Sequence, residues 1–154
     1  MKQISLLAMA LLFSSTVFAA AADQVSVQDP YVRLAPPNAP ATGAFMVIRN
    51  NGDKDIKLLK ADNPVSRVTE LHNHINDGGV MRMRPVSSIE IKAKGEAVLK
   101  PGSLHVMLID LKSALKEGDN VAITLSFDDG SSKQVEAKVV RPQPMAMPAM
   151  EHKH

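Results

Sequence analysis

The chain has 154 residues, with no cysteine, no tryptophan, one tyrosine and a formal net charge of +2. It lacks a basic block that would follow a phosphate backbone and a set of aromatic rings on which bases could stack, so nucleic acid is not an expected partner. The absence of cysteine excludes disulfides, thiolate ligands and thiol nucleophiles. Any soft metal donor must therefore be a methionine sulfur.

The first 22 residues have the pattern of a secretory signal peptide. Lys2 precedes an apolar stretch over 4–13, and alanines at 19–22 come before Asp23. A basic start, a short apolar stretch and a small-residue exit are typical of such a signal. A membrane anchor is less favoured, because the stretch is short for a hydrocarbon core of about 30 Å. We expect cleavage between 19 and 22 and export to the periplasm, and without a Cys we expect no lipoprotein anchor.

Residues 23–140 predict one domain of short β-strands. The chain alternates between apolar and polar residues at 24–28 and 31–34, and a proline-rich loop over 35–40 leads to a strand at 42–49. Further strands are expected at 54–61, 66–72, 80–86, 88–92, 97–100, 104–111, 120–127 and 133–140, with a candidate helical turn at 112–118. Short strands bounded by turn residues are typical of an antiparallel β-sandwich.

Two segments outside these strands carry clear local signals. Asn76-Asp77-Gly78-Gly79 predicts a hairpin turn, because these residues accept the positive φ that a tight turn needs. The last residues, 141–154, contain three prolines and few large side chains, so they cannot bury a core. We expect them to form a flexible, disordered C-terminal tail.

The histidines and most mature methionines gather in the same two segments. The five histidines lie at His72, His74, His105, His152 and His154, and the neighbouring methionines are Met81, Met83, Met107, Met145, Met147 and Met150. Only Met46 stands apart. A chance scatter would rarely sort two uncommon residue types in this way, so both segments are candidate metal sites.

Strand geometry makes the segment inside the domain plausible as a site. Residues two apart on a strand point to the same face, so His105 and Met107 project together, as do Met81 and Met83. The turn at 76–79 joins the strand of His72 to that of Met83. Adding the strand of His105 brings two imidazoles and two thioethers together from three segments.

This donor set favours Cu(I). Thioethers are soft, neutral donors that bind hard or borderline cations poorly, whereas imidazole suits Cu(I), Cu(II) and Zn(II) alike. Neutral ligands leave the charge of Cu(I) uncancelled, which allows the ion to be passed on. Methionine also forms no disulfide, so the site survives an oxidising compartment. Zinc would be expected to recruit cysteine, or histidine with carboxylate.

Packing alone remains an alternative for individual residues. Met46 on an apolar strand is best interpreted as core filler. Met81 and Met83 flank Arg82, so the core could account for one of them. His105 lies between Leu104 and Val106 and could be a satisfied buried histidine.

Other functional classes find little support. A blue-copper electron-transfer site needs a cysteine with two histidines, and this chain has no cysteine. No Ser/His/Asp arrangement, histidine-rich type-2 copper pattern or paired acid and base is evident, so we do not expect an enzyme. The open alternative is a periplasmic copper storage or resistance protein without a dedicated client.

From 70 to 111 the sequence resembles the periplasmic copper chaperones of the PCu(A)C family. The resemblance lies in Glu70-Leu71-His72, in 79–86 (GVMRMRPV) and in 99–108 (LKPGSLHVML). The family pattern is a His, ten residues, a Met, twenty-one residues and His-x-Met, and His72, Met83, His105 and Met107 fit it without a gap. The matched spacing selects Met83 over Met81.

The resemblance implies a cupredoxin-like (Ig-like) β-sandwich that holds Cu(I) near its surface and delivers it to other proteins. The client of this family is usually the CuA centre of cytochrome c oxidase, often alongside a thioredoxin-like assembly factor. Two residues after the first His some members carry Met, whereas this chain has His74, which makes His74 a candidate auxiliary ligand and Met81 a weaker one.

The tail resembles the His- and Met-rich extension of some family members. Its donors are Met145, Met147, Met150, His152 and His154. We expect them to bind a second copper, with Cu(II) as a candidate, and to help load the main site. The alternative is a solvated tail with incidental methionines.

Overall fold

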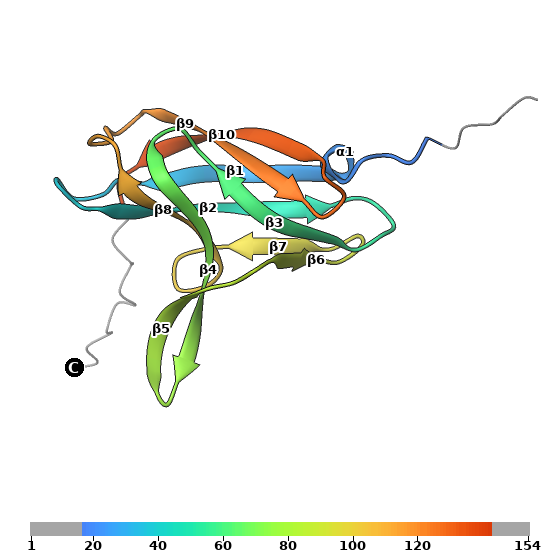
Figure 1. The fold of residues 1–154 in the computed structure, drawn as a ribbon, viewed down its shortest axis with the longest axis horizontal. Coiled ribbons are helices and arrows are strands. Elements are labelled where there is room, and N and C mark those ends of the chain that lie inside the picture. Colours follow the sequence, from blue (N-terminus) through green and yellow to red (C-terminus); the bar gives the residue numbers. More distant parts are fainter. Residues whose placement is uncertain (1–16, 143–154) are drawn as a thin grey trace, which may run out of the picture.

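The computed structural model describes residues 17–142, which are built almost entirely of strands (Figure 1). A short helix, α1 (Ala21–Gln24), precedes ten strands. These are β1 (Val25–Arg33), β2 (Ala41–Asn50), β3 (Ile56–Asp62), β4 (Ser66–Asp77), β5 (Val80–Pro85), β6 (Ile89–Ile91), β7 (Glu96–Leu99), β8 (His105–Leu111), β9 (Asn120–Phe127) and β10 (Ser132–Val140). Within this part of the chain, no helix has the length and apolar character needed to cross a membrane.

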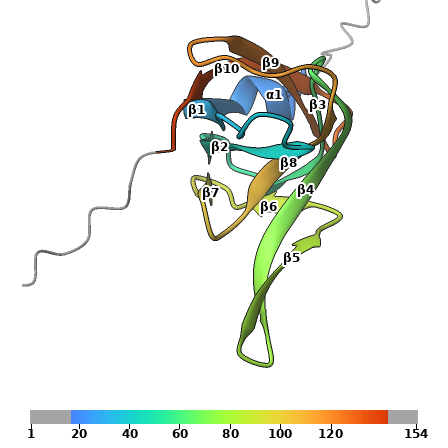
Figure 2. The same ribbon diagram turned by 90° about the vertical axis from the view of Figure 1, so that its left-hand side faces the viewer.

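The ten strands form one hydrogen-bonded sheet, and nine of them follow a single path. Its order is β5-β4-β8-β2-β1-β10-β9-β3-β6, and β7 pairs with β2 beside it. Seen along the long axis, the path curves around a shared interior (Figure 2). The all-β class expected from the sequence is confirmed. One pair, β1 with β10, is parallel, which makes the sheet mixed where an antiparallel one was expected.

The core follows from the two-residue period of the strands. On β9 the residues Val121, Ile123, Leu125 and Phe127 are buried while those between them are partly exposed. The same alternation buries Ile56 and Leu58 on β3, together with apolar residues of β2, β8 and β10. Successive side chains of a strand point to opposite faces, so the apolar residues of each predicted alternating strand point into the core.

Two local expectations were wrong. The strands expected at 24–28 and 31–34 are one strand, β1, because a bulge between Gln28 and Tyr31 accommodates Pro30. The helical turn expected at 112–118 does not form. The N–H of Lys112 donates to the Val65 carbonyl and that of Gly118 to the Val139 carbonyl, so this backbone pairs with neighbouring strands.

The N-terminal end of the described chain is hydrogen-bonded to the turn before β10. The Ala21 N–H donates to a carboxylate oxygen of Asp129 at 2.7 Å, and the Ala22 N–H donates to Ser131 Oγ at 3.0 Å. Ala21 is itself buried. The cleavage predicted between 19 and 22 thus falls among residues that contact the turn before β10, and it stays a prediction.

The β4–β5 hairpin extends away from the rest of the molecule (Figures 1 and 2). Its turn is the one that the sequence predicts. Gly78 and Gly79 have φ of 61° and 89°, the positive values of a two-residue hairpin loop, and Asn76 Oδ1 accepts the Gly79 N–H at 2.8 Å. β5 borders only β4, and all of its residues are exposed.

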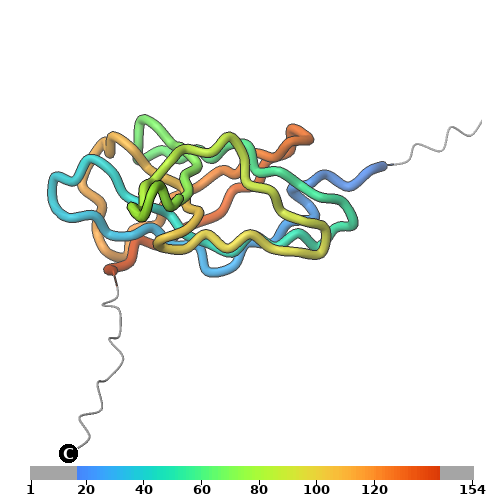
Figure 3. The backbone as a smooth tube through the Cα atoms, turned by 90° about the horizontal axis from the view of Figure 1, so that it is seen from below, coloured from blue at the N-terminus to red at the C-terminus, as the bar shows by residue number. Residues whose placement is uncertain are grey.

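The two ends of the described chain lie at opposite ends of the long axis (Figure 3). β10 ends near the proline-rich loop over 35–40, where the Leu34 N–H donates to the Val140 carbonyl. The residues before α1 lie at the far end.

Candidate metal centre

The candidate ligands are placed first by the pairing of β4 with β8. In this ladder His72 lies opposite His105, and Glu70 lies opposite Met107. Directly opposed residues on antiparallel strands share a face, so these four side chains project on the same side of the sheet. The ring centroids of His72 and His105 are 5.7 Å apart.

The β4–β5 hairpin adds the remaining thioether. Its register sets Met83 opposite His74, and Pro85 opposite His72. The turn predicted at 76–79 joins the strands of His72 and Met83, and the register makes these two residues diagonal neighbours. His74 has its ring centroid 5.4 Å from that of His105, so three imidazoles gather around the β4–β8 ladder.

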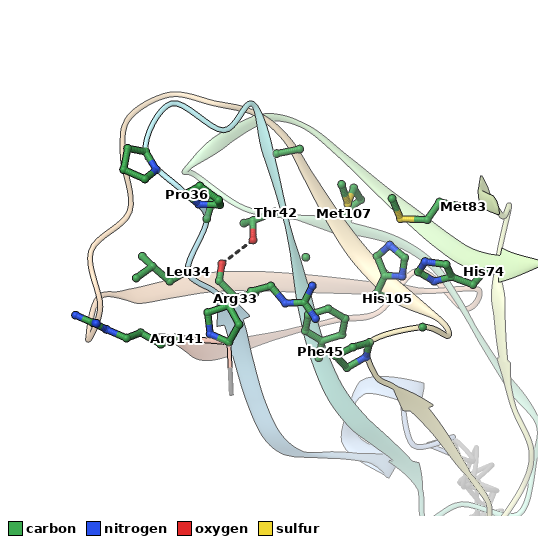
Figure 4. Close-up of a pocket in the computed structure, with 17 residues that line it drawn as sticks. Arg33, Leu34, Pro36, Thr42, Phe45, His74, Met83, His105, Met107 and Arg141 are labelled. Carbon is green, nitrogen blue, oxygen red and sulfur yellow. Dashed lines mark hydrogen bonds between the residues drawn. The ribbon is translucent and has the colours of Figure 1, made fainter. Parts of the chain in front are cut away.

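A cavity of about 820 Å³ opens at this point of the surface. The side chains of His74, Met83, His105 and Met107 gather at one end of it (Figure 4). His72 is not among the residues that line it. Met83 is 46% exposed and His105 only 3%, so the donors range from the surface to the interior.

The His105 ring is held by a backbone carbonyl. Its Nδ1 lies 2.9 Å from the Ser103 carbonyl oxygen, which can only accept a hydrogen bond. The proton therefore lies on Nδ1, and the lone pair of the neutral ring is on Nε2. Burial lowers the pKa of His105 below its ordinary 6.5, against the effect of the Ser103 carbonyl, and the nearby His72, His74 and Arg33 lower it further.

His72, the first histidine of β4, has a different environment. His72 Nε2 lies 2.6 Å from a carboxylate oxygen of Glu70, and its side chain is 12% exposed. His74 Nδ1 shares the Ser103 carbonyl with His105 at a longer 3.3 Å. No role was predicted for Glu70. The sequence signal for this contact is its two-residue spacing from His72, which puts both side chains on one face.

Residues of β1 and β2 pack beside His105, and none of them was predicted from the sequence to belong to the site. The Phe45 ring lies 6.0 Å from the His105 ring and 5.2 Å from the Arg33 guanidinium. Gly43, opposite Met107, makes room for this ring, because a Cβ there would lie 2.9 Å from it. These contacts join segments distant in sequence, so local patterns could not reveal them.

The other predicted donors lie away from the cavity or outside the described residues. Met81 is exposed and lies opposite Asn76, farther along the hairpin than Met83. Met46 is buried in the core, as predicted. The tail donors Met145, Met147, Met150, His152 and His154 lie outside the described residues. The tail begins with Arg141 and Pro142, which line the cavity.

The donors present determine which ions this face suits. Within residues 17–142, no three His, Asp or Glu side chains are arranged to hold a metal ion by themselves. The methionine sulfurs would be needed to complete a set of ligands. The buried, unpartnered Nδ1 of His72 and the neutral ring of His105 fit an ion that takes nitrogen and sulfur donors, which describes Cu(I).

We predict that His105 titrates below 6.5 in the metal-free protein. Since its folded pKa is lower than its unfolded one, the unfolded chain binds the extra proton between the two values. The free energy of unfolding should therefore fall as the pH drops below about 6.5 through that range. NMR titration of the His105 Cε1 proton, assigned with His105→Asn, measures the pKa, and a value at or above 6.5 would contradict the prediction.

Sequence relatives of the chain are bacterial proteins. A putative lipoprotein of Leifsonia xyli subsp. xyli is 31% identical over 119 residues, which are 77% of this chain and 70% of that protein. An uncharacterized protein of Rickettsia prowazekii is 35% identical over 101 residues. These residues are 65% of this chain and 56% of the Rickettsia protein.

Solved structures give the fold family. The copper-bound PCuAC domain of PmoF2 superposes with a TM-score of 0.67 at 18% identity, covering 82% of this chain and all of that domain. Apo-DR1885 from Deinococcus radiodurans has a TM-score of 0.61 at 33% identity, covering 92% and 95%. Its Cu(I) form has a TM-score of 0.56 at 34% identity, covering 75% of each chain.

The resemblance drawn from the sequence is confirmed by these matches. A family model described as putative lipoprotein LpqE-like matches residues 25–139. The fold is the cupredoxin-like fold of the PCuAC neighbours. The chain therefore belongs to the LpqE-like family, which is the family of the PCuAC domains.

Proposed function

We propose that this protein is a non-enzymatic copper chaperone that binds Cu(I) through His72, Met83, His105 and Met107. The observation that carries the proposal is the convergence of two imidazoles and two thioethers from β4, β5 and β8 on one face. Membership of the PCuAC family supports it, as does the Cu(I) form of the Deinococcus relative. Soft neutral donors favour Cu(I) over harder cations.

His74 is proposed as an auxiliary ligand. It lines the cavity with Met83, His105 and Met107, and it lies directly opposite Met83. These positions support a role in which His74 meets an incoming ion before His72 does. Met81 is a weaker candidate, because it lies two residue pairs beyond Met83 toward the tip of the hairpin.

The exposure of the donors supports delivery by ligand exchange. An acceptor's thiolates or imidazoles would reach Met83 first, since it is 46% exposed, and His105 last, since it is 3% exposed. Each incoming donor would replace one outgoing donor, so copper is never free. The acceptors we propose are the CuA subunit of cytochrome c oxidase and a thioredoxin-like assembly factor.

We further propose that the protein works in the periplasm. The support is the basic, apolar and alanine-rich order of residues 1–22, together with the lipoprotein descriptions of its family and of the Leifsonia relative. A site of Met and His donors without Cys also suits an oxidising compartment.

The assigned site is tested by anaerobic Cu(I) titration of the mature protein against a chromophoric competitor. His105→Ala and Met83→Leu should each lower the Cu(I) affinity by at least about tenfold, since even indirect partners of a metal ligand are worth that much. His74→Ala should weaken binding less than His105→Ala does. Met46→Leu is the matched control, because Met46 is buried in the core. Wild-type affinity in both ligand variants would mean that the site is wrongly assigned.

The role of the tail is tested by truncation after Pro142. The tail carries Met145, Met147, Met150, His152 and His154, and its first two residues, Arg141 and Pro142, line the cavity. We expect the truncated protein to keep one Cu(I) and to lose a second copper, measured as metal stoichiometry and Cu(II) retention. Unchanged stoichiometry and Cu(II) retention would leave the tail without a copper role.

Chaperone and store differ in what they do with the bound ion. We expect the Cu(I)-loaded protein to transfer its copper to a purified, metal-free CuA domain. The transfer is carried out under a reductant, and the assembled CuA centre is then measured by its absorption after exposure to air. A CuA domain lacking its cysteines is the control acceptor. If copper stays on the protein while the same domain accepts copper from a small-molecule complex, storage or resistance is the better function.

A further inference from the structure

Glu70 makes one specific contact, and the proposed function does not use it. A carboxylate oxygen of Glu70 lies 2.6 Å from His72 Nε2. Among the side-chain hydrogen bonds and ion pairs of residues 17–142, the Glu70 carboxylate has no other partner. A carboxylate only accepts hydrogen bonds, so the proton of this contact belongs to Nε2 of His72.

The other nitrogen of the same ring is the exception in this molecule. Across the described residues, His72 Nδ1 is the one buried side-chain nitrogen or oxygen without a hydrogen-bond partner. Leaving such an atom unpaired destabilises the folded state, so an unpartnered buried group calls for an explanation. With the proton on Nε2, the neutral ring carries its lone pair on Nδ1, where it can bind a metal ion.

The strand pairing sets a second imidazole, that of His105, beside His72. The two residues are directly opposed on β4 and β8, with ring centroids 5.7 Å apart. His105 has the reverse arrangement, because its Nδ1 donates to the Ser103 carbonyl and leaves Nε2 unprotonated. Each ring thus has one nitrogen fixed by an oxygen acceptor and one free lone pair, the usual arrangement of metal-binding histidines.

We propose that Glu70 is a positioning residue that holds the Nε2–H form of His72 and so keeps Nδ1 available for copper. The inference rests on the proposed function, and it adds that the two histidines bind through different nitrogens, Nδ1 of His72 and Nε2 of His105. Glu70 itself does not bind the ion. Glu70 lies directly opposite Met107, so the residue that holds His72 is on the same face as the thioether of this site.

The first test needs no metal. Long-range ¹H–¹⁵N NMR of the apo protein reports which nitrogen of each imidazole carries the proton. Wild-type His72 should be the Nε2–H form, Glu70→Ala should show a mixture of both forms, and Glu70→Gln should keep the Nε2–H form, because its amide oxygen still accepts. Glu96→Ala, which removes an exposed carboxylate from β7, should leave the His72 signals unchanged. An Nδ1–H form in the wild type would overturn the proposal.

The second test uses Cu(I) alone. Glu70→Ala should lower the Cu(I) affinity by about tenfold to a hundredfold, Glu70→Gln by less, and Glu96→Ala not at all. In the loaded wild type, the ¹⁵N shift of His72 should move at Nδ1. A shift at Nε2, an unchanged affinity in a folded Glu70→Ala variant, or a higher affinity, as expected if Glu70 only blocks the ring, would each overturn the inference. A wild type that binds no Cu(I) would instead overturn the proposed function, and the inference with it.

Discussion

The register between β4 and β8 is the constraint on which the candidate metal centre depends. Because side chains alternate along a strand, a slip of one residue would send either His72 or His105 to the opposite face. The buried pair Leu71 and Val106 prevents this slip, since these residues lie opposite each other with 4% and 0% exposure. Burial of Leu71 and Val106 in the core thus fixes the alignment of His72 with His105, the next pair along the ladder, whose side chains lie on the opposite face of the sheet.

The same sheet gives the donors unequal freedom. His105 lies on β8, which is paired on both sides by β4 and β2, and its ring contacts Phe45 and the Ser103 carbonyl. Met83 lies on β5, which ends the strand path and pairs only with β4. A fixed, buried imidazole beside an exposed thioether on an edge strand suits a site that must both hold an ion and release it.

The sequence predicted what depends on local patterns. Alternation located β9 at 120–127, as the structure has it, and Gly78-Gly79 located the hairpin turn. Local patterns could not predict the long-range pairing of β4 with β8, which sets His72 opposite His105 and Glu70 opposite Met107. The Ser103 carbonyl that fixes His105 gives no sequence signal, because every residue offers a backbone carbonyl. At 112–118 tertiary hydrogen bonds decided the backbone conformation.

The absence of cysteine and the burial of His105 address the same chemical difficulty. A metal donor is lost when a proton or an oxidant occupies its lone pair, and thiolates are open to both. Methionine does not titrate, and the lowered pKa of His105 keeps its ring neutral to a lower pH than an exposed histidine would allow. Burial alone would also hide the lone pair. The Ser103 carbonyl avoids this by fixing the proton on Nδ1, so that Nε2 stays free in a ring that borders the cavity.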